Sequence, residues 1–268
     1  MIIENLIIGN EILQGHTNDI NSYWIAKRII KYGHTLRRIL TIGDDVEQIE
    51  ISLKYLLERK PDIIITCGGL GPTFDDMTLK GVAKALNKEL VKNEKAYKMI
   101  KKSYKQAYER GLVKLKGMTK EREKMAYLPK GGKPLVNKRG TAPSVKLKEG
   151  KTIIYCLQGV PAEMKGTFNS SIKPILKKES GEFIEKGFTF ENIGESQIAP
   201  YITELEEKYP ELWIKTHPKI GLAVEVEVTV TALNVDDGEK LVDKVIEKIK
   251  SIVLNLDGHL KDTNEKEE

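Results

Sequence analysis

The sequence predicts an α/β domain with three layers, followed by a small α+β domain. Strand and helix patterns alternate over the first part of the chain, and the strand at Ile63–Ile65 is apolar on both faces. Such a strand belongs in a parallel sheet covered by helices on both sides. In contrast, apolar and polar residues alternate from Val224 to Thr231, which is typical of an antiparallel strand with one exposed face.

Length and composition fit this organisation. The 268 residues exceed the usual size of one domain, so we expect domains at 1–179 and 182–256 and a disordered tail at 257–268. A hydrophobic share of 40% supports a substantial core, 31% charged residues suggest a heat-adapted protein, and a net charge of +5 permits anionic small-molecule ligands. The sequence contains no signal-peptide pattern or bilayer-spanning run, and we expect a soluble, cytoplasmic protein without a membrane partner.

The first half of the α/β domain repeats a strand–helix plan. We expect strands at Glu4–Gly9 and Leu36–Ile42, a polar loop at Asn10–Ser22, and a helix at Val46–Arg59 that ends before Pro61. The helix after the polar loop is expected to bury Tyr23, Ala26, Ile29 and Ile30, and the helix after the third strand Leu79, Val82, Ala83 and Leu86. Ligands bind at the carboxyl ends of the strands in such sheets.

The second half of the chain adds a basic segment and the small domain. A Lys-rich helix at Glu94–Gly111 continues in a basic run to Lys124. A solvated surface, phosphate steering and nucleic-acid binding all fit this segment, although its aromatic residues do not strongly favour nucleic acid. A strand at Ile153–Leu157 meets a glycine turn and a helix that Pro174 should kink. The small domain follows the order βαββα, with elements at Gly187–Glu191, Glu195–Tyr209, Leu212–Thr216, Val224–Thr231 and a last helix through Leu241, Val245, Ile249 and Ile252.

The most informative segment is Thr66–Thr78, with the sequence TCGGLGPTFDDMT. Its glycines allow close approach to a ligand, and the Pro-Thr-x-x-Asp pattern resembles a helix start whose free N–H groups suit a phosphate. Two adjacent carboxylates, Asp75 and Asp76, would repel that anion unless a divalent cation neutralises them. The segment therefore predicts a phosphate site with a metal ion.

A plain structural interpretation of the same segment is a turn followed by a capped helix. However, a cap needs neither two acids nor a glycine cluster. Walker A, dinucleotide-binding and Gly-x-Ser-x-Gly motifs are missing from the sequence, and its four histidines lack metal-ligand spacing. Cys67 and Cys156 each end an apolar strand, and we expect both to be buried without a chemical role.

Several separated motifs resemble the CinA family. These are Gly68–Thr78, Asn10–Leu13 with Gly15, Asp19 and Asn21, Gly140–Pro143, and Gly159–Met164. The resemblance implies a MoaB/Mog-like, molybdopterin-binding type of domain followed by a KH-like domain. The Gly15–Asn21 motif is also similar to the N-terminal domain of eukaryotic FAD synthases. The sequence shows no counterpart of the family's nicotinamide mononucleotide deamidase domain, so we do not expect that activity.

The resemblance implies a pyrophosphatase acting on ADP-ribose or FAD with a divalent metal, magnesium or cobalt, and potassium. Asp75 and Asp76 are then the catalytic metal ligands, with Thr78 as a third catalytic residue. The implied phosphate- and nucleotide-binding residues are Gly68, Gly69, Gly71, Thr73, Glu11, Asp19, Asn21, Thr141, Ser144, Gly159 and Glu163. Gln158 and Ser144 depart from the family's pattern, which has proline and glycine at these positions.

Two other functions fit the same residues. The fold also serves as a molybdopterin- or nucleotide-binding module in cofactor biosynthesis, and a non-catalytic nucleotide sensor is a third interpretation. The small domain lacks a Gly-x-x-Gly loop, which argues against RNA as a partner. We expect a homodimer, in which an exposed strand at Val224–Ala232 is a candidate contact.

Overall fold

The computed structural model describes residues 1–219 and 224–261. The chain divides into two compact units, Met1–Glu179 and Ser180–Glu268. Each unit buries its own apolar side chains. Within the described residues, no helix combines the length and apolar character needed to cross a bilayer.

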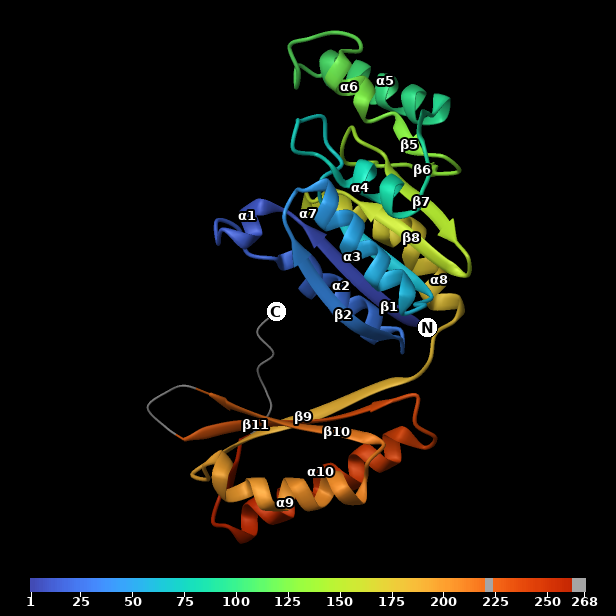
Figure 1. Ribbon diagram of the computed structural model, residues 1–268. Coiled ribbons are helices and arrows are strands. Elements are labelled where there is room, and N and C mark those ends of the chain that lie inside the picture. The colour runs from blue at the N-terminus through green and yellow to red at the C-terminus, as the bar shows by residue number, and fades with distance from the viewer. Residues whose placement is uncertain (220–223, 262–268) are drawn as a thin grey trace. The chain divides into compact units, whose positions relative to one another are not determined.

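The first unit is built on a six-stranded sheet with the order β2-β1-β3-β8-β7-β6 (Figure 1). Its parallel strands are β1 (Ile2–Ile8), β2 (Thr35–Ile42), β3 (Ile63–Cys67) and β8 (Thr152–Leu157). The strands β7 (Ser144–Glu149) and β6 (Lys133–Leu135) continue the sheet in antiparallel pairing. The expected parallel sheet is therefore a mixed one, because the short turn between β7 and β8 permits only an antiparallel hairpin.

Helices cover both faces of this sheet, which confirms the three layers expected from the sequence (Figure 1). On one face lie α3 (Val46–Glu58) and α4 (Thr78–Ala85), and on the other α2 (Ile20–Lys31) and α7 (Pro161–Thr167). The buried face of α2 differs from the expected one: Ile25 and Ile29 are fully buried, whereas Tyr23 is 61% exposed. This rotation arises because Asn21 and Ser22 take the buried positions of the first turn.

The kink expected near Pro174 is a change of helix type. A π-helical segment, η1 (Phe168–Ile172), separates α7 from α8 (Lys173–Lys178). Proline has no N–H for the regular helical hydrogen bond, and a wider turn accommodates this loss. Phe168 and Ile172 remain fully buried through the transition.

An excursion between α4 and β6 carries the basic segment. It contains β4 (Leu90–Lys92), α5 (Glu94–Glu109), α6 (Lys120–Lys124) and β5 (Tyr127–Pro129), and β4 pairs with β5. Ala96, Ile100 and Tyr104 bury one side of α5 against the core. The remaining sides of α5 carry its lysines, so this helix is amphipathic.

The second unit is a four-stranded antiparallel sheet with helices against one face. Its elements are β9 (Phe183–Glu191), α9 (Glu195–Lys208), β10 (Leu212–Lys219), β11 (Glu225–Leu233), α10 (Gly238–Asn255) and β12 (His259–Leu260), with the strand order β10-β11-β9-β12. Val226, Val228 and Val230 face the helices, as their alternation predicts. Residues 220–223 and 262–268 lie outside the described residues.

One expectation for this unit is wrong, and another stays a prediction. The segment after Leu256 was expected to be disordered, yet β12 pairs with β9 and Lys261 forms ion pairs with Glu191 and Glu225 at 2.6 and 2.9 Å. The rest of that predicted tail falls outside the described residues. The strand β11, which overlaps the dimer contact expected at Val224–Ala232, lies between β10 and β9, so both of its backbone edges are already paired. A contact through the exposed face of this strand stays a prediction.

Candidate functional site

The loop after β3 has a backbone that only glycine can adopt. Gly68 has a φ of +115°, and a Cβ there would overlap the carbonyl oxygen of Ile8; Gly69 has a φ of +63°. Within the described part of the chain, the backbone N–H groups of Gly69, Leu70 and Gly71 donate to no protein acceptor. Three successive free N–H groups form a concave surface that favours an anion.

The helix start expected at Pro72–Asp76 is wrong, because α4 begins at Thr78. Instead, Thr73 closes a loop on Asp76: its backbone N–H and its hydroxyl donate to Asp76 Oδ2 at 2.8 and 2.6 Å. The N–H of Thr73 is thus already used and is not available to a phosphate. Interaction with the Thr73 side chain is also the main cause that holds the pKa of Asp75 below its ordinary value.

Nine of the predicted site residues line one pocket of about 400 Å³ at the carboxyl ends of the parallel strands. They are Glu11, Gly68, Gly69, Gly71, Asp75, Asp76, Thr141, Gly159 and Glu163. Glu11 comes from the short helix α1 (Asn10–Leu13) that follows β1, and Glu163 comes from the first turn of α7. The others come from the loops after β3, before β7 and after β8. The parallel order of the strands brings these distant segments together.

The other predicted residues support the pocket without lining it. Asp19 caps α2 by accepting a hydrogen bond from the Ser22 N–H at 2.9 Å, and Asn21 donates to the Gly159 carbonyl at 2.6 Å. Thr78 is fully buried and donates to the Gly68 carbonyl at 2.8 Å, so it holds the glycine loop instead of facing a ligand. Ser144 is buried as well, and its hydroxyl donates to Gln158 Oε1 at 2.7 Å.

Two polar residues that the sequence interpretation did not assign to the site also line the pocket, Asp44 and Gln158. Asp44 follows β2, and its carboxylate accepts a hydrogen bond from the Asn10 N–H at 2.7 Å. Its position just after a parallel strand was the available signal, since all such strand ends meet at one edge. Gln158 is 4% exposed and donates to the Ala142 carbonyl at 2.8 Å, which fixes the neighbouring loop.

The pocket has a strongly acidic side. Burial raises the pKa of Asp44 despite the hydrogen bond from Asn10, and the charges of Glu11, Asp75 and Asp76 raise it further. The charges of these three carboxylates therefore oppose the ionisation of Asp44. Lys124, whose ammonium donates to the Thr73 carbonyl, is a nearby cation, and partial burial lowers its pKa.

This donor set fits a hard divalent cation. Carboxylate oxygens are the protein ligands that magnesium prefers, and magnesium is commonly held by one or two carboxylates with substrate oxygens and water completing the shell. Within the described residues, no three acidic, histidine or cysteine side chains are arranged as a complete metal site. Asp75 and Asp76 contribute two carboxylates to the pocket, and a metal ion held by them stays a prediction.

The two cysteines are not suited to nucleophilic chemistry. Both are buried and unpaired, and burial is the largest cause that raises the pKa of Cys67 to about 12 and that of Cys156 to about 11. A thiol with so high a pKa is not a thiolate at neutral pH. The burial expected for Cys67 and Cys156 is confirmed.

Comparison with known proteins agrees with this fold. A protein from Sulfurisphaera tokodaii is 40% identical over 261 residues, covering 95% of this chain and 96% of the relative. A protein from Thermococcus kodakarensis is 37% identical over 262 residues, covering 96% and 99%. The crystal structure of a protein described as CinA with unknown function, from Thermoplasma acidophilum, matches with a TM-score of 0.59 and 35% identity over 65% of this chain and 99% of that one. The family described as "Probable molybdopterin binding domain" matches residues 4–178, and the chain belongs to this family.

Proposed function

We propose that this protein is a metal-dependent pyrophosphatase that hydrolyses ADP-ribose or an FAD-type dinucleotide. The observation that carries the proposal is one pocket that combines the free N–H groups of Gly69–Gly71 with the carboxylates of Asp75 and Asp76. The N–H groups favour a phosphate, whereas the carboxylates repel it unless a cation lies between them. A pyrophosphate with its metal satisfies both halves of the pocket.

In the proposed reaction, water attacks one phosphorus of the pyrophosphate and the bridging P–O bond breaks, giving AMP and a second monophosphate. Asp75 and Asp76 hold magnesium or cobalt, which when bound neutralises phosphate charge and lowers the pKa of water. The N–H groups of Gly69 and Gly71 stabilise the negative charge that develops on the phosphate. Asp44 lines the same pocket, and its carboxylate takes the proton of the attacking water in this proposal.

A second candidate function is binding of molybdopterin or a nucleotide without hydrolysis. The family match favours this alternative, because the family's description concerns molybdopterin binding. The same pocket can bind the phosphate of a pterin ligand through Gly69–Gly71. The likeness of the Gly15–Asn21 motif to FAD synthases and the KH-like character of the second unit remain predictions.

The test is incubation of purified protein with ADP-ribose or FAD in the presence of magnesium or cobalt and potassium, with AMP measured by chromatography. We expect AMP to appear, and Asp75→Asn and Asp76→Asn to lower kcat at least 100-fold, because each removes a metal-binding charge. Asp236→Asn, which changes an exposed carboxylate of the second unit, is the matched control and should leave kcat unchanged. Absence of turnover together with tight binding of a pterin would replace the pyrophosphatase with the binding function.

A further inference from the structure

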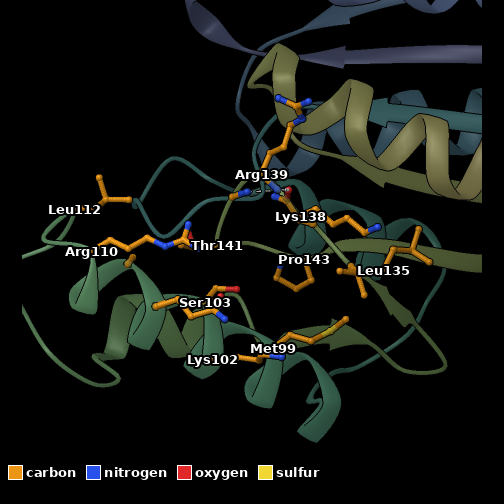
Figure 2. Close-up of a pocket in the computed structure, with 15 residues that line it drawn as sticks. Met99, Lys102, Ser103, Arg110, Leu112, Leu135, Lys138, Arg139, Thr141 and Pro143 are labelled. Carbon is orange, nitrogen blue, oxygen red and sulfur yellow. Dashed lines mark hydrogen bonds between the residues drawn. The ribbon is translucent and has the colours of Figure 1, made fainter.

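A second pocket, of about 450 Å³, lies between α5 and residues 135–143. Figure 2 shows α5 forming one wall, with Met99, Lys102 and Ser103 along it, and the loop with Leu135 and Pro143 forming the other. None of the functional roles assigned above uses this wall of α5. The pocket therefore needs an explanation of its own.

The charged side chains that line this pocket all have the same sign. They are Lys102, Arg110, Lys138 and Arg139, and no aspartate or glutamate lines it. Within the described part of the chain, none of the four forms an ion pair, although nearby Lys105 pairs with Glu109 and Lys92 with Glu123. Cations gathered around a cavity repel one another, and an anion in the cavity relieves that repulsion.

The four cations differ in where they point. Figure 2 shows the side chain of Arg110 reaching from the end of α5 toward Thr141, and Arg139 leaving the loop on the other side. Arg139 passes close to Gly166 of α7, where its Cδ lies 3.6 Å from the position a Cβ would take. Lys102 on α5 and Arg110, which directly follows α5, are thus the cations best placed to hold an anion inside the pocket.

The rest of the pocket wall is largely apolar. Met99, Leu112, Leu135, Val136 and Pro143 line it, and Leu112 and Val136 are 73% and 55% exposed. Exposed apolar side chains beside a cavity are typical of ligand pockets. A wall of this kind, with cations at its edge, suits a planar ring that carries a phosphate.

The two pockets meet at Thr141, which lines both of them. The loop that carries Thr141 is fixed by Asn137, whose amide donates to the Ala142 carbonyl at 2.9 Å and to Glu163 Oε2 at 2.5 Å. One side of Thr141 is therefore acidic and suits a phosphate with its metal, and the other side is basic and suits a phosphate without one.

We propose that the basic pocket binds the nucleoside monophosphate half of the ligand, independently of any metal. Its ring lies on the apolar wall and its phosphate contacts Arg110 and Lys102. That a bond is cleaved next to this pocket rests on the proposed function. Binding of a mononucleotide in the basic pocket does not depend on that function.

The test is calorimetric titration of the full chain with AMP and with FMN in the presence of EDTA, which removes metal ions. We expect both nucleotides to bind more tightly than inorganic phosphate, and more weakly as the salt concentration rises. Arg110→Ala and Lys102→Ala should each weaken binding about tenfold, as expected for loss of a charged hydrogen bond. Lys101→Ala, at an exposed position of the same helix that does not line the pocket, is the matched control and should change nothing.

The outcomes separate this inference from the proposed function. Asp75→Asn should still bind AMP in EDTA, so binding without any hydrolysis would support the basic pocket and remove the pyrophosphatase. Conversely, hydrolysis with AMP affinity unchanged in the double variant Lys102→Ala/Arg110→Ala would overturn the inference and keep the enzyme. Equal affinity for AMP and inorganic phosphate would also overturn it, because the apolar wall would then contribute nothing.

Discussion

Ser144 and Gln158 form a buried hydrogen-bonded pair in which Gln158 lines the pocket and Ser144 does not. They are also two of the positions at which the sequence departs from the CinA pattern that it resembles, which has glycine and proline there. In the structure the two residues contact each other: the Ser144 hydroxyl donates to Gln158 Oε1 at 2.7 Å, and Ser144 and Gln158 are 0% and 4% exposed. A buried amide needs hydrogen-bond partners, so each of the two residues satisfies a buried polar group of the other.

A double-mutant cycle tests this coupling. Ser144→Ala should lower the free energy of unfolding by about 1–3 kcal/mol, because the Gln158 oxygen loses its donor while buried. Gln158→Met should also destabilise, and the double variant should cost about 1 kcal/mol less than the sum. Chemical denaturation provides the values, with Ser196→Ala, at an exposed position, as the control. Strict additivity would mean that the pair is not coupled.

The electrostatics of Asp44 predict how cation binding depends on pH. Its pKa is raised in the folded protein, mainly by burial and further by Glu11, Asp75 and Asp76. Ionising Asp44 therefore costs stability as the pH rises from the ordinary carboxyl pKa through the raised one. A bound cation compensates for this cost, so cation affinity should increase with pH across the same window.

Titration with magnesium from pH 4 to pH 8 measures this dependence, and Asp44→Asn is the test variant. The variant should show a smaller change of affinity across the window. Without metal at pH 7 the variant should also be slightly more stable, with a free energy of unfolding higher by on the order of a few tenths of a kcal/mol after allowance for solvent screening. A pH dependence identical to that of the unchanged protein would mean that the ionisation of Asp44 does not influence cation binding in this pocket.

At the scale of elements, the sequence predicted the parallel strands well and the loop chemistry less well. Ile63–Ile65 could be placed because a strand apolar on both faces has few alternatives. The start of α4 was misplaced because the Thr-x-x-Asp pattern also fits a loop in which Asp76 accepts from Thr73, and local sequence does not separate the two. Asp44 was missed because its proximity to Asp75 comes from strand order, not from spacing along the chain.

The short strand β12 is another element that local sequence could not predict. Two residues carry too little pattern to predict a strand, and His259–Leu260 becomes one only because β9 offers it an edge. Removing residues 257–268 should lower the unfolding temperature of the second unit, since the β9 pairing and the ion pairs of Lys261 are both lost.

Calorimetry of the full chain measures this effect. For a unit of this size, each kcal/mol lost from the free energy of unfolding lowers the unfolding temperature by about 4–8 °C. Lys261→Ala separates the two contributions and should have the smaller effect, because exposed ion pairs contribute little. An unfolding temperature unaffected by the deletion would mean that β12 does not stabilise the sheet.

At the scale of the molecule, the candidate chemistry belongs to the first unit alone. Both pockets are lined entirely by residues between Ile8 and Glu163. The apolar clusters follow the same division: those of the first unit lie before Glu179, and that of the second unit lies after Ser180. The homodimer expected from the sequence stays a prediction, and its contact does not use a free backbone edge of β11.

This division predicts that fragment 1–179 folds and keeps the ligand affinity and any kcat of the full chain. A matched control is fragment 1–149, which lacks β8 and so removes the strand between β3 and β7 from the sheet. That fragment should show no cooperative unfolding, because a central strand with its buried Ile154 and Tyr155 is missing. Circular dichroism and amide NMR spectra compare the fragments with the full chain. If the amide spectrum of 1–179 does not overlay on that of the full chain, the first unit depends on the second for its fold, and the site must be studied in the complete protein.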